Sequence, residues 1–222
     1  MTSEQFLQRL DAVIERHAML SHPFYQEWNA GTLSMETLRE YSKQYYAHVS
    51  AFPTYVSAVH SHSDDIVVRQ MLLENLLEEE QGPENHPELW MRFAEGLGVD
   101  RNDVRNADLL ESTRNSVNSL KNVTHSQNAL EGVAALYAYE SQIPQVALTK
   151  REGLKKFYGL EDERAVSFFR VHETADIIHR QVERDILSTV TDPAQQERII
   201  AAAEHSAKAL WSFLDGVKEA YC

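Results

Sequence analysis

Apolar residues recur at helical spacing along almost the whole chain, and this pattern constrains the fold more than any other feature of the sequence. Near the N-terminus, one such stripe consists of Phe6, Leu7, Leu10, Val13 and Ile14. A stripe at this spacing forms one face of an α-helix that packs against a core. The chain has only 8 glycines and 6 prolines, too few turn residues for a fold made of many short strands. The sequence therefore predicts an all-α fold without a sheet.

Helix-capping and helix-breaking residues divide the chain into separate helices. Ser34 is a candidate N-cap for a long helix that runs towards Ser61. Pro53 inside this helix is expected to produce a kink, because proline lacks the N–H that a helix interior needs. Further helices are expected from 64 or 65 to 82, from 87 to 98, at 126–143, at 163–187 and from 192 onwards, with two short ones between 100 and 124. No linker or repeat interrupts them, so residues 1–222 are predicted to form a single helical domain.

The balance of charged residues argues against two classes of partner. Asp and Glu number 34 against 21 Lys and Arg, which gives a formal net charge of -13. A nucleic-acid-binding protein needs a basic face to bind phosphates, and anionic membrane surfaces attract basic segments. We therefore expect neither nucleic acid nor a membrane as a partner.

Cysteine usage and the N-terminus indicate a compartment. The single cysteine, Cys222, excludes internal disulfides and cysteine-rich metal clusters. Charged side chains near the N-terminus interrupt any apolar run of the kind that a signal peptide needs. No segment approaches the roughly 20 apolar residues that span a bilayer. These features predict a cytoplasmic protein.

The most specific local pattern lies between His172 and His179. His172, Asp176 and His179 occur at positions i, i+4 and i+7, on one helix face, so their side chains are expected to converge on a common centre. Imidazole and carboxylate ligands without thiolates suit iron, manganese or zinc. A solvated polar helix face would show the same pattern, and the spacing alone leaves that alternative open.

Two further segments supply ligands that could join the same site. Glu79 lies in an acidic run at the expected end of a helix, where negative charge is unfavourable unless a cation is nearby. The Gly-Pro break that follows would let His86 fold back towards Glu79. Glu140 lies in an apolar, aromatic helix, where a buried carboxylate is costly unless it is paired or binds a metal. A hydrogen bond from a tyrosine hydroxyl would be the alternative partner for Glu140.

Together these residues form a candidate two-metal site. The set contains three carboxylates and three imidazoles, namely Glu79, His86, Glu140, His172, Asp176 and His179. Two divalent ions bring four positive charges, so three carboxylates leave one net positive charge and the site can accept O₂ and anionic oxygen ligands. Glu and His residues on facing helices of a bundle are an established route to such sites. The prediction from the residues is an oxidase with two transition-metal ions.

The ordered set of candidate ligands resembles one family in particular. The chain resembles the Chlamydia protein associating with death domains (CADD) and its bacterial relatives, within the haem-oxygenase-like di-metal oxidase superfamily. The resemblance covers nearly the whole chain and rests on the stretches 24–28, 45–53, 79–86, 132–144 and 172–179. It implies a single-domain bundle of seven or more helices, related in fold to pyrroloquinoline quinone synthase and thiaminase-like proteins. The lack of an internal cysteine nucleophile argues against a thiaminase activity.

The resemblance also implies a function, that of a self-sacrificing 4-aminobenzoate synthase in folate biosynthesis. By position, Tyr25 would supply the ring of the product and Lys150 its amine, with Tyr41 and Tyr139 as redox-active phenols. The metals would be two iron ions, two manganese ions or one of each. O₂ would be the co-substrate, and an unidentified electron donor would act as the external reductant. The resemblance further implies a homodimer.

Two other functions remain open at this point. A metal-free oxidase of the pyrroloquinoline quinone synthase type would use the same fold, with His and Tyr as acid–base groups instead of ligands. A non-enzymatic helical interaction protein would use its acidic helices to bind a partner and would need no converging set of histidines and carboxylates. Metal content distinguishes both alternatives from the di-metal oxidase.

Overall fold

The computed structural model describes all 222 residues of the chain, except for the side chain of Ala175. In chain order the elements are α1 (Ser3–Glu15), the short 3₁₀ helix η1 (Met19–Ser21), α2 (Pro23–Ala30), α3 (Met35–His62), α4 (Ile66–Glu80), α5 (His86–Gly96), α6 (Arg101–Arg105), α7 (Glu111–Thr124), α8 (Ala129–Glu140), α9 (Ile143–Tyr158), α10 (Glu163–His172), α11 (Ala175–Ser188) and α12 (Pro193–Tyr221). The described residues contain no strand, which confirms the predicted all-α fold with seven or more helices.

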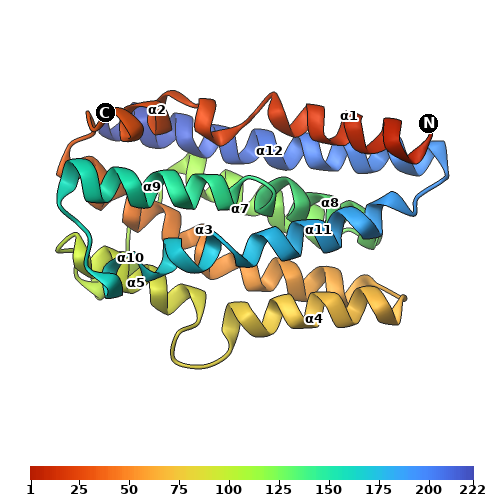
Figure 1. The fold of residues 1–222 in the computed structure, drawn as a ribbon, viewed down its shortest axis with the longest axis horizontal. Coiled ribbons are helices and arrows are strands. Elements are labelled where there is room, and N and C mark those ends of the chain that lie inside the picture. The colour runs from red at the N-terminus through yellow and green to blue at the C-terminus, as the bar shows by residue number, and fades with distance from the viewer.

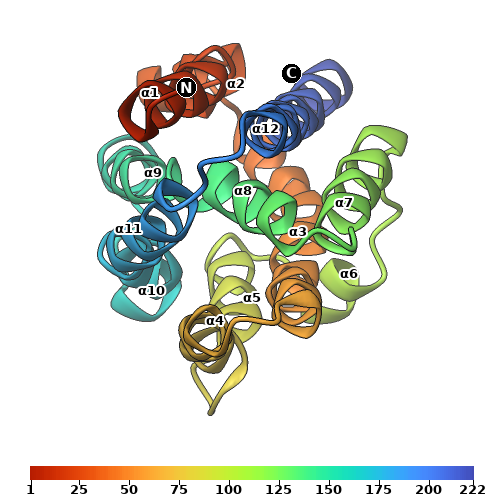
Figure 2. The same cartoon turned by 90° about the vertical axis from the view of Figure 1, so that its right-hand side faces the viewer.

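The longer helices run along one axis of the molecule (Figure 1). Helices α1 and α2 lie against α12, and an ion pair between Arg9 and Glu197 joins α1 to α12 at a distance of 2.6 Å. Seen along the bundle, α8 lies near the middle, and it contacts α3, α7, α9, α11 and α12 (Figure 2). One cluster of buried hydrophobic side chains extends through the bundle from Phe6 to Val217.

Helix α8 is buried because its sequence is almost entirely apolar. Every residue from Gly132 to Glu140 is buried. Gly132 permits a close approach to α3, since a Cβ atom at this position would lie 2.5 Å from Cγ2 of Val59. The central position of α8 brings Glu140 into the interior, where its carboxylate contacts α4 and α11.

The prediction of one helix at 163–187 is wrong, because the structure contains two helices in this range. Helix α10 ends at His172, and α11 begins at Ala175, after two intervening residues. Between them, Thr174 has a φ of −123°, outside the helical range. The guanidinium of Arg151 in α9 pairs with Glu173 (Nη2–Oε2 distance 3.0 Å) and so links the residues between α10 and α11 to α9. This contact joins residues far apart in the sequence, so local periodicity does not reveal it.

A further helix, α9, follows α8 where none was predicted. Pro144 was expected to end the preceding helix, but it is the second residue of α9. Proline is well tolerated in the first turn of a helix, because the N–H that it lacks would have no partner there. The presence of α9 matters for the site, since this helix carries Lys150 to a buried position.

The other helix boundaries agree closely with the predictions. Ser34 caps α3, and its Oγ accepts a hydrogen bond from the N–H of Thr37 at 2.9 Å. Pro53 lies inside α3, which continues through it to His62, and the kink expected there stays a prediction. Among the described residues, no helix has both the length and the apolar character needed to cross a membrane.

Candidate metal centre

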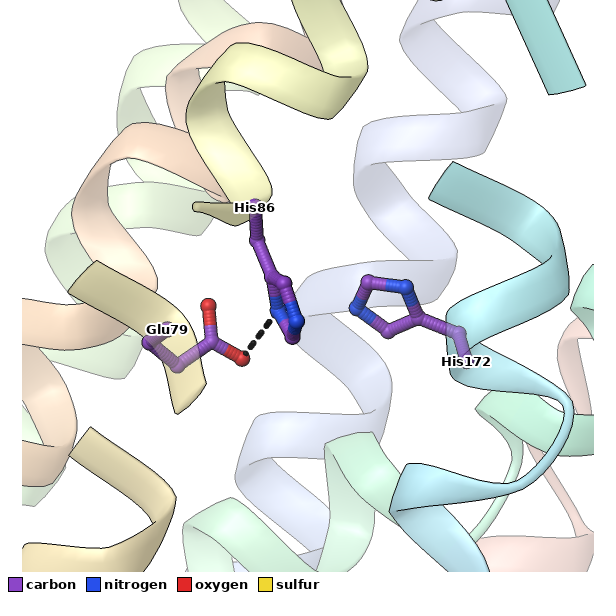
Figure 3. A group of neighbouring side chains, drawn as sticks. All are labelled: Glu79, His86 and His172. Atoms are coloured by element: carbon purple, nitrogen blue, oxygen red, sulfur yellow. Dashed lines mark ion pairs between the residues drawn. The ribbon is translucent and has the colours of Figure 1, made fainter. Parts of the chain in front are cut away.

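The turn between α4 and α5 brings Glu79 and His86 together. Gly82 in this turn has a φ of 79°, a conformation that glycine adopts without steric cost. Asn85 then caps α5 by accepting a hydrogen bond from the N–H of Glu88 at 3.0 Å. His86, the first residue of α5, therefore lies beside the end of α4, with its Nδ1 atom 2.7 Å from Oε1 of Glu79 (Figure 3).

His172 completes a first group with these two residues. It approaches from α10 on the far side of His86, and the two imidazole centroids are 4.3 Å apart (Figure 3). One ligand atom from each of Glu79, His86 and His172 lies within 4.8 Å of the others, and all three side chains are buried. The Nδ1 atom of His172 lies 2.7 Å from the carbonyl oxygen of Phe168. Because a carbonyl can only accept, Nδ1 carries the proton, and Nε2 of His172 is free to bind a metal.

Glu140, Asp176 and His179 form a second group of the same kind. Their ligand atoms also lie within 4.8 Å of one another, and all three side chains are buried. The Nδ1 atom of His179 is 3.3 Å from Oε1 of Glu140 and 3.6 Å from Oδ1 of Asp176. Asn75 of α4 donates a hydrogen bond to Oε1 of Glu140 at 2.9 Å and so orients this carboxylate.

The two groups correct one expectation from the sequence. The spacing of His172, Asp176 and His179 predicted that all three side chains converge on one centre, but the break after α10 separates them. His172 belongs to the first group, and Asp176 and His179 belong to the second. The six residues are nevertheless neighbours, since residues of both groups line one small cavity.

Burial shifts four of the six residues towards neutral forms. It lowers the pKa of His86 and of His172 to about 4, and it raises the pKa of Asp176 to about 6. Burial, reinforced by repulsion from Glu140, also raises the pKa of Glu79 well above its usual value.

His179 and Glu140 shift the other way, because burial is outweighed by their mutual contact: the pKa of His179 is raised to about 10 and that of Glu140 is lowered. Neutral imidazoles are the form that binds metals, and a bound cation would favour the ionised carboxylates. His179 would therefore release its proton on binding a metal.

Unpartnered buried atoms provide a test of whether these residues suit a metal. Several buried polar atoms have no hydrogen-bond partner among the described residues, including Nδ1 of His86, Oε2 of Glu140, Oδ2 of Asp176 and Nδ1 of His179. Although Nδ1 of His86 lies close to Glu79, the contact lacks hydrogen-bond geometry. Atoms left in this way are costly, and they cluster here with the oxygen and nitrogen chemistry that suits iron and manganese. The residues therefore fit a pair of transition-metal ions.

The cavity beside the two groups connects them to the predicted phenols and amine. Its volume is about 30 Å³, enough for one or two molecules the size of water. Tyr45, Tyr139 and Lys150 line it together with apolar residues such as Phe52 and Val146. The cavity is thus a place where a small molecule such as O₂ would meet both the candidate ligands and redox-active side chains.

Lys150 is buried among aromatic rings and is no surface charge. It is 3% exposed, and its Nζ atom donates a hydrogen bond to the hydroxyl of Tyr41 at 2.6 Å. The Tyr41 hydroxyl in turn lies 2.9 Å from that of Tyr25. Burial lowers the pKa of Lys150 well below its usual value, so the amine tends towards its neutral, nucleophilic form.

The four predicted redox residues lie at different distances from the cavity, and a fifth residue joins them. Tyr139 and Lys150 line the cavity, whereas Tyr25 and Tyr41 lie behind it. The hydroxyl of Tyr139 is 2.6 Å from that of Tyr45, whose ring stacks on Tyr41 with centroids 5.4 Å apart. This role of Tyr45 was not predicted from the sequence, although Tyr45 follows Tyr41 by four residues and lies on the same face of α3.

Glu183 is a second residue that sequence analysis missed. It lies in α11, four residues after His179, and is 2% exposed. Both of its carboxylate oxygens are buried without a hydrogen-bond partner in the described structure. The spacing signal was present in the sequence, because Asp176, His179 and Glu183 share one helix face.

Comparisons with known proteins agree with this geometry. The family model described as an iron-containing redox enzyme matches residues 39–211. A 4-aminobenzoate synthase from Nitrosomonas europaea is 43% identical over 100% of this chain and 94% of its own length, and one from Chlamydia pneumoniae is 38% identical over 96% and 94%. The solved structure of a CADD-like protein of unknown function from Nostoc punctiforme has the same fold, with a TM-score of 0.81 over 99% of both chains at 17% identity. The resemblance inferred from the sequence is confirmed, and the chain belongs to the family of iron-containing redox enzymes.

Proposed function

We propose that this protein is an O₂-dependent 4-aminobenzoate synthase that builds its product from its own side chains. The observation that carries the proposal is the buried contact of Lys150 with Tyr41 and Tyr25, next to the cavity shared by the two candidate ligand groups. The full-length similarity to proteins named 4-aminobenzoate synthase supports the same conclusion.

The two groups would each hold one metal ion. Glu79, His86 and His172 would bind the first, and Glu140, Asp176 and His179 the second. We propose iron, manganese or one of each, since these ions accept mixed oxygen and nitrogen ligands. When bound, the metal pair supplies the electrons that reduce O₂ and the oxidising power for the ring. An external reductant would restore the reduced metals.

The chain's own residues would supply both parts of the product. The ring of Tyr25 carries its two substituents para to each other, as 4-aminobenzoate does. A bond from Nζ of Lys150 to the ring carbon Cζ of Tyr25 would therefore replace the bond to the phenolic oxygen, which would leave as water. Release of the product would break the Cε–Nζ bond of Lys150 and the Cα–Cβ bond of Tyr25, and Cβ would become the carboxylate carbon. Both cleavages are oxidations, and O₂ would accept the electrons. The Nζ atom lies 4.8 Å from the centroid of the Tyr25 ring. Such proximity raises the effective concentration of the amine greatly.

Two other tyrosine rings lie at nearly the same distance from the amine. The centroids of the Tyr41 and Tyr45 rings are 4.9 Å and 4.8 Å from Nζ of Lys150, so distance alone does not select the donor. We propose Tyr25 as the donor, following the family resemblance, and Tyr41 as the phenol that exchanges a hydrogen bond with both partners. Tyr139 would exchange electrons and protons at the cavity wall.

The decisive experiment uses protein with isotope-labelled tyrosine in a solution that contains no labelled compound. Protein carrying ring-labelled tyrosine is supplied with iron and manganese, a reductant and O₂, and the product is analysed by mass spectrometry. We expect labelled 4-aminobenzoate at no more than about one equivalent per chain, with loss of mass at residue 25. Tyr25→Phe should abolish it, whereas the control Tyr55→Phe, which changes a buried tyrosine bonded to the carbonyl of Val117, should not. Turnover of free tyrosine by an intact chain would contradict the proposal.

Three further properties are proposed. We expect a homodimer from the family resemblance, a separate molecule as electron donor, and a cytoplasmic location from the cysteine usage. Sedimentation velocity of the purified chain tests the first of these. Elemental analysis of protein from cells supplied with iron and manganese tests the alternative of a metal-free oxidase, which would contain neither metal.

A further inference from the structure

Glu183 is a buried acid that forms no ion pair with a lysine or arginine in the described structure. Glu140 and Asp176 repel its charged form, and a proton shared with Glu140 relieves part of this repulsion. Without that proton, both oxygens of Glu183 lack a hydrogen-bond partner in the described structure. The arginines next to it in sequence are engaged elsewhere. Arg184 pairs with Asp11 at 2.6 Å, and Arg180 contacts the carbonyl oxygen of Ser141 at 3.4 Å.

The space beside Glu183 has both polar and apolar walls, and it borders the second group. A cavity of about 60 Å³ lies between α4 and α11, and Asn75, Glu78 and His179 line it together with Glu183. Asn75 and His179 both contact Oε1 of Glu140. Glu183 therefore shares a cavity with two residues that contact Glu140, and its carboxyl group lies within hydrogen-bond reach of that of Glu140.

We propose that Glu183 is a further ligand of the metal ion bound by Glu140, Asp176 and His179. This inference rests on the proposed function and deepens its account of the metal centre. A bound cation compensates the charge of neighbouring buried carboxylates, and it can take the place of a proton that they share. With Glu183 the centre has four carboxylates, whose charge equals that of two divalent ions. The second ion would then have three carboxylates and one imidazole, and the first one carboxylate and two imidazoles.

Manganese binding by metal-free protein tests this assignment. The probe is Mn²⁺ alone, titrated into wild-type protein, Glu183→Gln and the control Asp185→Asn, which changes an exposed acid on the same helix. We expect two ions per chain in the wild type and the control. Glu183→Gln should weaken one of the two by at least about tenfold, since even residues that only support a ligand change metal affinity by about 10–100-fold. If Glu183→Gln binds both ions with the same affinities as the wild type, the inference is overturned.

Thermal unfolding separates a ligand from a structural residue. If Glu183 is a ligand, Glu183→Gln leaves the midpoint of metal-free protein close to that of the wild type and reduces the rise that Mn²⁺ produces. A residue needed only for packing would lower the midpoint equally with and without Mn²⁺, and that result would overturn the inference. The variant His179→Ala distinguishes the two proposals. If it loses an ion and Glu183→Gln does not, the proposed function stands and Glu183 is no ligand. If neither loses an ion, the proposed centre is itself wrong.

A structure of the wild-type protein crystallised with Mn²⁺ gives an answer that does not depend on how any variant folds. We expect a carboxylate oxygen of Glu183 at about 2.0–2.4 Å from the second ion, the distance of a directly bound carboxylate. Density that places both oxygens beyond this range would overturn the inference.

Discussion

Two buried polar regions lie next to each other in this bundle, and they differ in how complete they are. In the two ligand groups, atoms of His86, Glu140, Asp176 and His179 lack hydrogen-bond partners among the described residues. In the tyrosine–lysine region, by contrast, Lys150 bonds to Tyr41, Tyr41 to Tyr25, and Tyr45 to Tyr139. The first region is suited to bind cations from outside. The second is already satisfied, as expected if it holds its reactants as part of the chain.

Removing a ligand should have the largest effect. We expect His172→Ala to lose the ion of the first group and Glu140→Ala that of the second, each with a fall in affinity of more than about 100-fold, because supporting residues alone account for about 10–100-fold. Elemental analysis and Mn²⁺ titration measure this. Both variants should remain helical by circular dichroism. Unchanged metal content in both variants would mean that these residues are buried polar groups and no metal ligands.

Adding the missing partner should stabilise the first region, and no added molecule should stabilise the second. At a free Mn²⁺ concentration of about 100 times Kd, we expect the free energy of unfolding to increase by about 2.7 kcal/mol for each of the two ions bound. Free tyrosine at millimolar concentration should leave it unchanged, because the buried rings leave no space for another. A rise in thermal midpoint with tyrosine, measured by calorimetry, would show that the second region also takes a ligand.

The burial of Lys150 should appear in the pH dependence of stability. Burial lowers its pKa in the folded protein below the usual 10.5, so the unfolded chain binds the extra proton between these two values. The free energy of unfolding should therefore increase with pH between the folded-state pKa of Lys150 and 10.5. The expected slope is about 1.4 kcal/mol per pH unit. The variant Lys150→Met should lack this slope. Parallel curves for the two proteins, measured by urea unfolding, would mean that Lys150 is not buried.

A smaller effect is expected from one hydroxyl. Tyr45→Phe removes the hydrogen bond to Tyr139, and we expect a loss of about 0.5–1.5 kcal/mol in the free energy of unfolding. The control is Tyr46→Phe, which changes the half-buried neighbour of Tyr45 and should stay within about 0.5 kcal/mol. If Tyr45→Phe changes the free energy of unfolding as little as the control does, the hydrogen bond between Tyr45 and Tyr139 does not stabilise the protein. The contrast between the two regions would then be weaker than described.

The sequence allowed the six ligand candidates to be found but not their division into two groups. Each candidate has a local signal, such as the helical spacing of His172 and Asp176 or the apolar surroundings of Glu140. The division depends on the break after α10, which is held by a contact between Glu173 and Arg151 in another helix. Local periodicity contains no information about such a contact.

The residues missed in the sequence were missed for different reasons. Pro144 is compatible with the end of one helix and with the start of the next, and only the packing of α9 decides between them. Glu183 and Tyr45 have the same helical spacing as their neighbours, but an acidic or aromatic residue at that spacing is usually solvated or part of a core. Their significance emerges from the unpartnered oxygens of Glu183 and the contact of Tyr45 with Tyr139.

The burial of Tyr25 has a consequence for the lifetime of the protein. Its ring is 1% exposed and packs against Phe24, Trp28 and Tyr41, so consuming it would remove an aromatic side chain from the core. Truncation of a buried aromatic residue typically destabilises a domain by about 3–5 kcal/mol, a large part of the 5–15 kcal/mol that holds such a domain folded. A spent chain would thus unfold more readily and become a substrate for cellular proteases. The supply of product would then be limited by the rate at which ribosomes replace the protein.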